Sequence, residues 1–173
     1  MDVTRHQAVE ILHHVHERIG GLFAHLSEEA FDRRGTIGCG EWSAKDLAGH
    51  LASWEEITVR SLEEWRRGER PEIEGVLEAR AVDRLNEENV AAAILATPQE
   101  ARERFDLAFT RLVEAIEGIT DEEWSARAPY PRAFPTTLAG FLGTLVGGPD
   151  RPFGHAYVHL QSLEIYVAEA THA

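Results

Sequence analysis

The segment GEWSAKDLAGHLASWE, residues 40–55, contains a helix start followed by a histidine on the apolar side of that helix. Ser43 is expected to cap the helix, because a serine hydroxyl accepts a hydrogen bond from a backbone N–H of the first turn, and Asp46 lies near the positive end of the helix dipole. At about 100° per residue, His50 falls within the apolar stripe. A histidine that faces a core needs a partner for each ring nitrogen, which a buried hydroxyl, a backbone carbonyl or a metal ion supplies.

The rest of the chain repeats this helical pattern. Apolar residues three and four positions apart predict a bundle helix before the quoted segment. A similar stripe follows Thr97 and Pro98, which suit the cap and first turn of a helix that Gly118 ends. No alternating strand pattern with hairpin signals occurs in the sequence. The helices predicted for the bundle span residues 5–29, about 44–67, Pro98 to Gly118 and about 152–171.

Two long connections separate these helices. Residues 73–96 are rich in Glu, Ala and Leu, so this connection is predicted to be mostly helical. Residues 124–154 hold five prolines and five glycines, so this segment is predicted to be irregular and packed onto the bundle. The sequence therefore predicts an all-α protein, a four-helix bundle with a long, partly helical connection between the second and third helices, in a single domain of residues 1–173.

The composition restricts the partners. The 173 residues include 30 acidic and 17 basic side chains, a formal net charge of −13, and such a surface repels nucleic-acid phosphates and anionic lipids. The single cysteine, Cys39, excludes a disulfide within the chain and fits a reducing compartment. The first residues lack a signal-peptide pattern, and no apolar run approaches the roughly 20 residues of a membrane span. We expect a soluble cytoplasmic protein without nucleic-acid or membrane partners.

Three of the nine histidines are candidates for a metal site. His155 and His159 are four residues apart on the predicted last helix, which places both on one flank of its apolar stripe. With His50 on a facing helix they make a set of three imidazoles, and three protein ligands plus water is the arrangement of catalytic zinc. The alternative is that internal hydrogen bonds satisfy the same rings, because an isolated pair at this spacing is common by chance.

A second group of histidines occurs in HHVHE, residues 13–17. His14 points away from the apolar stripe of the first helix, so it is expected to be solvated. His13 and His16 lie at the edge of the stripe and have no facing partner, which favours boundary positions over metal ligands.

Several other side chains are expected around the three imidazoles. Asn86 is predicted to line the pocket from the connecting helix. Trp42 and Trp54 are predicted to form apolar walls where a cofactor or ligand binds, with core packing as the favoured alternative for each. Glu55 lies about 140° around the helix from His50 and is expected outside the ligand sphere. The glycine-rich segment before His155 is predicted to be either a rim of the pocket or a plain loop. The candidate catalytic acids, bases or orienting groups are Tyr157, Gln161 and Tyr166.

Three segments, in order, resemble the DinB-like superfamily, which includes the YfiT-like proteins and the N-terminal domain of mycothiol-dependent maleylpyruvate isomerase. The quoted residues 40–55 resemble its second-helix signature, G-W-S-x-K-D-x-x-x-H-x-x-x-W-E. AVDRLNEENVAAA at 81–93 with EARERFDLAFTRLVEAIEGITDEEW at 100–124 resembles the ClbS/DfsB branch, and Asn86 stands at its typical asparagine. GHAYVHLQSLEIY at 154–166 resembles the closing helix with its H-x-x-x-H pair.

The resemblance implies a four-helix bundle whose metal ligands are His50, His155 and His159. It also implies metal-dependent chemistry, because the superfamily contains metal-dependent thiol transferases, isomerases and a cyclopropane-opening self-resistance hydrolase. We expect a divalent ion, zinc or nickel, with a low-molecular-weight thiol as a possible further cofactor. A divalent ion on three neutral imidazoles keeps its full charge and acidifies a water or a thiol.

Two functions are therefore expected from different classes. The first is an enzyme that transfers a thiol to, or hydrolyses, a reactive small molecule in detoxification or self-resistance. The second is a non-catalytic bundle that sequesters an apolar small molecule. A homodimer is also expected, because the apolar residues of the segment 134–146 must either pack on the bundle or form a contact between chains, with the dimer slightly favoured. These residues are Phe134, Leu138, Phe141, Leu142 and Leu145.

Overall fold

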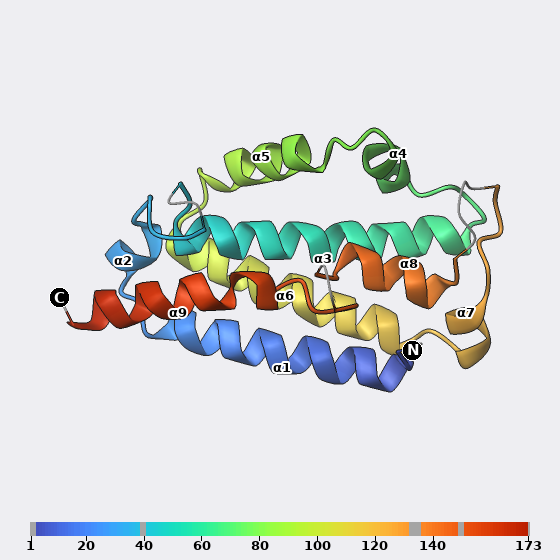
Figure 1. Ribbon diagram of the computed structural model, residues 1–173, viewed down its shortest axis with the longest axis horizontal. Coiled ribbons are helices and arrows are strands. Elements are labelled where there is room, and N and C mark those ends of the chain that lie inside the picture. The colour runs from blue at the N-terminus through green and yellow to red at the C-terminus, as the bar shows by residue number, and fades with distance from the viewer. Residues whose placement is uncertain (1–2, 39–40, 132–135, 149–150, 173) are drawn as a thin grey trace.

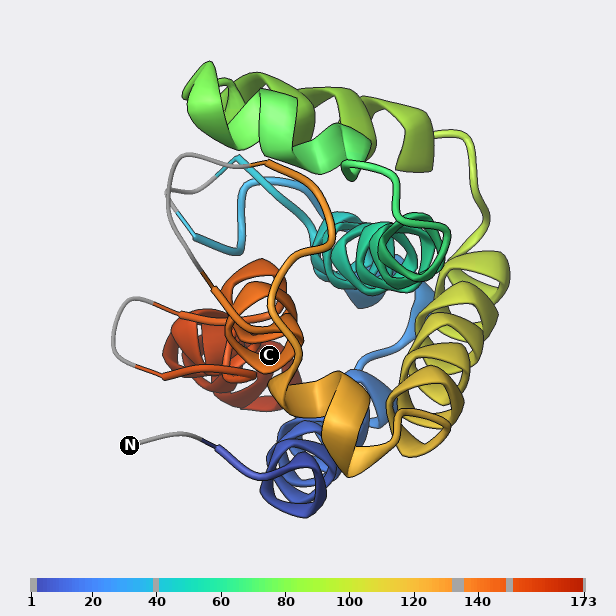
Figure 2. The same cartoon turned by 90° about the vertical axis from the view of Figure 1, so that its right-hand side faces the viewer.

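The computed structural model describes residues 3–38, 41–131, 136–148 and 151–172, and these form nine helices and no β-strand. Four long helices make a bundle (Figure 1): α1 (Arg5–Ala24), α3 (Ala44–Arg66), α6 (Pro98–Glu117) and α9 (Tyr157–His172). Seen end-on in Figure 2, α1, α6 and α3 occupy three corners. The fourth corner is shared by α9 and the shorter α8 (Leu138–Leu145), which follow one another along the bundle in Figure 1. The predicted all-α four-helix bundle is confirmed.

Threonine and serine side chains determine where the long helices begin. Thr4, Ser43 and Thr97 each accept a hydrogen bond from the backbone N–H three residues on, and the side chain at that position accepts one from the N–H of the capping residue. These reciprocal caps satisfy two of the N–H groups that a helix start leaves without partners. Gly118 is the C-cap residue of α6, as its position in the sequence predicts.

The central helix of the fold is α3. Buried apolar residues form two clusters, one toward each end of the bundle, and α3 contributes to both. Its outer side is covered by α4 (Glu72–Glu78) and α5 (Val82–Ala93), so the predicted partly helical connection lies as a cover over α3 (Figure 2). Because α3 is enclosed on several sides, it buries polar residues as well as apolar ones, including His50, which is 2% exposed.

Glycine permits the close approach of α5 to α3. A Cβ atom at Gly49 would lie 2.7 Å from the Cβ of Ala93, a distance that real side chains essentially never show. One turn further along α3, the indole Nε1 of Trp54 donates a hydrogen bond of 2.9 Å to Oδ1 of Asn86 on α5. This packing and this hydrogen bond hold the cover in place next to His50.

Three predicted boundaries were wrong. The first helix ends at Ala24, and a separate α2 (Glu28–Asp32) begins after its own cap, Ser27. The last helix begins at Tyr157 rather than near residue 152, because the preceding residues form turns. The segment predicted as irregular contains α8, which Thr137 caps; its apolar residues follow the spacing of a helix, although proline and glycine flank it. A further short helix, α7 (Asp121–Ser125), precedes it.

The apolar residues that favoured a homodimer pack within the chain instead. Four of them lie on α8 and are buried in the core cluster at that end of the bundle: Leu138, Phe141, Leu142 and Leu145. Phe134 lies outside the described residues. Burial of these residues within the chain removes the observation that favoured a homodimer, and the homodimer stays a prediction without that support. Among the described residues, no helix has the combined length and hydropathy that crossing a membrane requires.

Candidate metal centre

Two segments of the bundle bring the three predicted ligands together. His50 lies on α3, two turns from the Ser43 cap, and His159 lies in the first turn of α9. The spacing predicts that His155 lies on the last helix, but the structure places it in the turn before that helix. Its backbone N–H donates a 2.9 Å hydrogen bond to the carbonyl of Val146 at the end of α8, which fixes the turn against that helix. The site therefore lies where α8 and α9 meet opposite α3.

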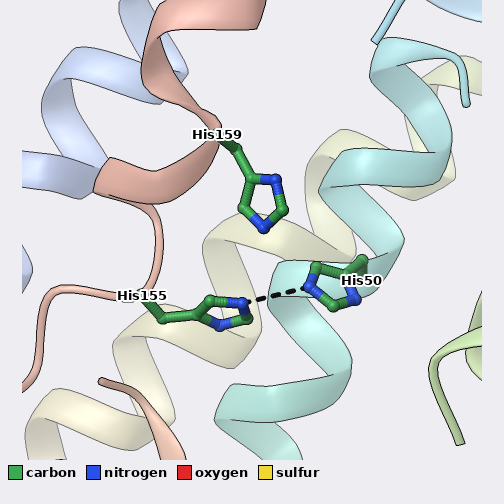
Figure 3. A group of neighbouring side chains, drawn as sticks. All are labelled: His50, His155 and His159. Carbon is green, nitrogen blue, oxygen red and sulfur yellow. Dashed lines mark hydrogen bonds between the residues drawn. The ribbon is translucent and has the colours of Figure 1, made fainter. Parts of the chain in front are cut away.

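The three imidazoles converge on one point (Figure 3). The Nε2 atoms of His50 and His155 lie 3.1 Å apart, and one ligand atom from each of the three rings lies within 4.8 Å of the others. A tetrahedral ion bound at 2.0–2.1 Å places its nitrogen ligands about 3.3 Å apart. The spacing therefore suits an ion such as zinc after small side-chain adjustments.

Hydrogen bonding alone leaves this cluster incomplete. One N–H···N bond satisfies the facing nitrogens of His50 and His155, but Nε2 of His159 is buried and has no partner. A buried nitrogen without a partner is costly, by about 1–3 kcal/mol. A divalent ion between the three rings accepts a lone pair from each of them, so a metal site satisfies the cluster better than the hydrogen-bonded alternative does.

The imidazoles are held in the form that binds a metal. Burial lowers the pKa of His50 to about 2, with a further contribution from the neighbouring rings of His155 and His159. Burial and the ring of His159 lower the pKa of His155 to about 4, and burial also lowers the pKa of His159. Each ring is therefore neutral at physiological pH, and no ligand proton has to be displaced before coordination.

A cleft of about 330 Å³ leads from the surface to the three rings. Asn86 and Trp54 line it, as predicted, and Trp42 forms a further wall with its ring centroid 4.9 Å from that of His50. The glycine-rich segment before His155 contributes Gly147 and Gly148 to the rim, as one of its two alternatives predicts. Among the described residues that line the cleft, none is an acid, lysine or arginine; the remaining lining residues are Leu77, Val82, Thr144, Leu145 and Val158.

The three candidate catalytic residues do not line this cleft. Tyr166 is buried in the core, and its hydroxyl donates a 2.6 Å hydrogen bond to the carbonyl of Ala30, so packing accounts for it. Gln161 is exposed. The ring of Tyr157 lies against Arg151, whose guanidinium carbon is 5.1 Å from the ring centroid. None of the three side chains therefore lies at the cleft, where a catalytic role beside the three imidazoles would place it.

The second histidine group is separate from the site. His13 and His14 are exposed, and His16 is half-buried with its ring stacked on Phe109 at a centroid distance of 3.8 Å. Nε2 of His16 lies 3.2 Å from Oδ1 of Asp106 on α6. These are the boundary positions that the sequence predicts.

The fold and the site together define a class, the helical bundles that hold a candidate three-histidine metal centre between two facing segments. Within that class, the chain belongs to the family of the mycothiol maleylpyruvate isomerase N-terminal domain, whose model matches residues 12–146. The match includes His50 but ends before His155 and His159, so the complete ligand set depends on the geometry described above. No functionally curated protein matches the sequence.

Solved structures share the fold at low sequence identity. An uncharacterised protein from Escherichia coli UTI89 superimposes with a TM-score of 0.73 at 13% identity, over 96% of this chain and 94% of that one. The mycothiol-dependent maleylpyruvate isomerase superimposes with a TM-score of 0.64 at 12% identity. A histidine-to-alanine mutant of the isomerase gives 0.63 at 11%. The alignment covers 96% of this chain but 60% of the isomerase chain, so this chain corresponds to part of that enzyme.

Proposed function

We propose that this protein is a divalent-metal-dependent enzyme that acts on a reactive small molecule, by thiol transfer or by hydrolysis. The observation that carries the proposal is the number of protein ligands beside an open cleft. His50, His155 and His159 are the only described residues that form a group able to hold an ion, and they line the cleft. Structural zinc sites fill four positions with protein, whereas catalytic sites keep a position for water or substrate.

The residues of the cleft have distinct roles in this proposal. A bound divalent ion supplies Lewis acidity that lowers the pKa of a water or a thiol. Trp42 and Trp54 provide apolar walls that exclude bulk water and strengthen electrostatic interactions at the site. Oδ1 of Asn86 accepts the indole N–H of Trp54, which leaves the amide N–H groups of Asn86 as donors to an oxygen of the substrate.

The cleft also indicates the kind of substrate. Its described lining residues carry no fixed charge apart from the ion that the imidazoles hold, and the chain has a net charge of −13. We infer a neutral or cationic electrophile with apolar groups that contact the two tryptophans. A low-molecular-weight thiol is the proposed co-substrate for the transfer reaction, in line with the mycothiol dependence stated for the isomerase of the same family.

The test uses protein purified without a histidine tag. Elemental analysis identifies the bound ion, and epoxide, cyclopropane and haloaromatic electrophiles are then assayed with and without low-molecular-weight thiols. We expect turnover by metal-loaded protein, loss of turnover after chelation, and the same loss in His159→Ala. The matched control, His6→Ala, changes an exposed histidine at the start of α1 and should retain turnover.

Two outcomes contradict the proposal. Turnover that survives chelation excludes a role for the ion. Equally tight binding of an apolar probe by loaded and stripped protein, without turnover, supports the second candidate, a bundle that sequesters small molecules; the apolar walls of the cleft are the observation that favours it.

A further inference from the structure

A small cavity adjoins the metal centre and shares Trp54 and His155 with the cleft. Apolar residues form most of its wall, among them Leu12 of α1, Leu51 of α3 and Phe105 of α6. Three polar side chains also face it: His16 from α1, Glu55 from α3, and the proposed ligand His155. His155 and Trp54 therefore stand between the cleft and the cavity, since both line the two spaces.

Two of the polar groups at this cavity have buried atoms without partners. Oε2 of Glu55 and Nδ1 of His16 are both inaccessible to solvent and make no hydrogen bond. Buried polar atoms in proteins are nearly always hydrogen-bonded, to protein or to ordered water, and each exception costs about 1–3 kcal/mol. Two such atoms on residues that line one small cavity point to a shared partner inside it.

The cavity has the size and the polarity that one water needs. The volume open to the centre of a water molecule is about 20 Å³. One buried water requires roughly 10–15 Å³ on this measure and two to four polar partners. Glu55, His16 and His155 supply three. A second metal ion does not fit, because ligand atoms of these three residues do not form a group within 4.8 Å of one another in the described part of the chain.

The donors and acceptors around such a water are complementary. His16 directs Nε2 to the carboxylate of Asp106 at 3.2 Å, so Nε2 carries the proton and Nδ1 accepts a hydrogen bond. Burial, together with the negative charges of Glu56 and Asp106, raises the pKa of Glu55 well above its ordinary value, which favours the protonated carboxyl, a hydrogen-bond donor. A water that accepts from Glu55 and donates to His16 still has one acceptor position for a third group.

The third group is the metal ligand. Nε2 of His155 faces His50, which leaves Nδ1 as its second ring nitrogen (Figure 3). Histidines that bind a metal through one nitrogen almost always donate the N–H of the other to a carboxylate, a carbonyl or a water, and this bond fixes the tautomer and the ring orientation. Because His155 lines the same cavity as Glu55 and His16, a water in that cavity is the partner that we assign to this N–H.

We propose that Glu55 is a positioning residue of the metal centre: with His16 it holds one buried water, and this water accepts the Nδ1–H of His155 and fixes that imidazole for coordination. The inference rests on the proposed metal centre and assigns a role to a carboxyl group that does not touch the ion. Glu55 acts on metal affinity through His155, and it contacts neither the cleft nor the substrate.

The test compares Glu55→Leu, Glu55→Gln and the control Glu63→Gln, which changes an exposed carboxylate elsewhere on α3. We measure the affinity for Zn²⁺ and Ni²⁺ by competition with a chelator, and the melting temperature of the metal-free proteins. Loss of such a supporting group typically weakens metal binding by about 10–100-fold, which we expect for Glu55→Leu. Glu55→Gln retains hydrogen-bonding capacity and should lose less than about tenfold, and Glu63→Gln should bind both ions like the wild type.

The melting temperature of the metal-free variant distinguishes a positioning role of Glu55 from a packing role. If Glu55 acts only through the water and His155, its replacement by leucine should change the melting temperature of the metal-free protein little, whereas a structural role predicts a lower melting temperature together with weaker binding. The tautomer of His155, measured by long-range ¹H–¹⁵N correlation in the metal-free wild type, should be Nδ1–H, and Glu55→Leu should lose this preference.

Three results overturn the inference. The first is metal affinity within about twofold of the wild type in the folded Glu55 variants. The second is an NMR result that His155 of the metal-free wild type is not in the Nδ1–H tautomer. This result overturns the role of Glu55 even if Glu55→Leu does not fold. The third is a wild-type protein that binds neither ion, a result that overturns the metal centre itself and not only the role of Glu55.

Discussion

Nε2 of His50 and Nε2 of His155 lie 3.1 Å apart although 105 residues separate them in the sequence. Burial lowers the pKa of each ring, so both are neutral. Two neutral imidazoles at this distance share one proton in a hydrogen bond, whereas a third ring beside them has no role in that bond. The buried, unpartnered Nε2 of His159 is the observation that favours a metal ion at the cluster over hydrogen bonding alone.

Replacement of His159 by alanine should remove the metal but leave the fold. The remaining two imidazoles make a weak site, so we expect less than a tenth of the wild-type metal content after dialysis, measured by elemental analysis. The free energy of unfolding of the metal-free protein should fall by about 1 kcal/mol or less, because the bundle keeps its apolar core. Full metal retention by the variant would falsify the three-histidine site. His6→Ala, on the exposed part of α1, should behave like the wild type in both measurements.

Acid should destabilise the metal-free protein through its buried histidines. The unfolded chain protonates a histidine near pH 6.5, but burial lowers the pKa of His50 to about 2 and that of His155 to about 4 in the folded protein. The unfolded state therefore binds more protons below pH 6.5, and stability is lost as the pH falls from there toward the folded pKa values.

The contribution of His50 to this pH dependence can be measured by comparing the wild type with His50→Gln. Denaturant titrations of metal-free wild type and His50→Gln, between pH 6.5 and 4, should show a steeper loss for the wild type, by up to about 1.4 kcal/mol per pH unit. Burial raises the pKa of Glu55 and acts in the opposite direction, since its stabilising share is lost as the pH rises, but this effect is common to both proteins. If the free energy of unfolding falls equally with pH in the two proteins, burial does not lower the pKa of His50.

The hydrogen bond from Trp54 to Asn86 should stabilise the packing of α5 against α3 beside the cleft. Asn86→Leu removes the acceptor and leaves a part-buried indole N–H without a partner, which we expect to lower the free energy of unfolding by about 1–2 kcal/mol. Trp54→Phe in the Asn86→Leu background should cost less than in the wild type. A double-mutant cycle measures this coupling; strictly additive effects would mean that the bond contributes nothing. Glu87→Leu, at an exposed neighbouring position, is the control for the introduced leucine.

Gly49→Ala should destabilise the protein although alanine favours helices. The helix preference alone gains about 1 kcal/mol, but the new Cβ meets the Cβ of Ala93 at 2.7 Å and forces α5 away from α3. We expect a net loss of about 1–2 kcal/mol in thermal unfolding, and partial recovery in Gly49→Ala/Ala93→Gly. A stabilised single variant would mean that α5 moves aside freely. Gly75→Ala, where a Cβ meets nothing within 4 Å, is the matched control.

The sequence predicts most of the fold because its signals are local. Ser43 and Thr97 mark helix starts by side-chain chemistry alone, and both form the predicted caps. The segment that forms α8 shows why other elements are difficult to predict. Its apolar residues follow helical spacing over only two turns, and the prolines and glycines around it favour the prediction of an irregular segment. Only the burial of its apolar side against α3 and α7 identifies it as part of the core.

The clustering of the three histidines was predictable, but their surroundings were not. A spacing of four brings His155 and His159 together even though the first lies in a turn, because that turn advances the chain much as a helix does. Tyr166 follows His159 by seven residues, so it lies on the same side of α9 but about two turns further along, where it packs in the core. The cavity beside Glu55 is also lined by residues of α1, α6 and the turns before α9, which are distant in sequence from α3, so no local pattern reveals it.

The position of His155 in a turn, tied to α8 and followed directly by α9, has a consequence for local unfolding. An ion that holds His155 and His159 to α3 binds only while the C-terminal helix is docked, so detachment of α9 must also release the ion. With free metal at 100 times its dissociation constant, the opening free energy of this helix rises by about 2.7 kcal/mol. Hydrogen exchange in α9 would then slow about a hundredfold relative to the stripped protein.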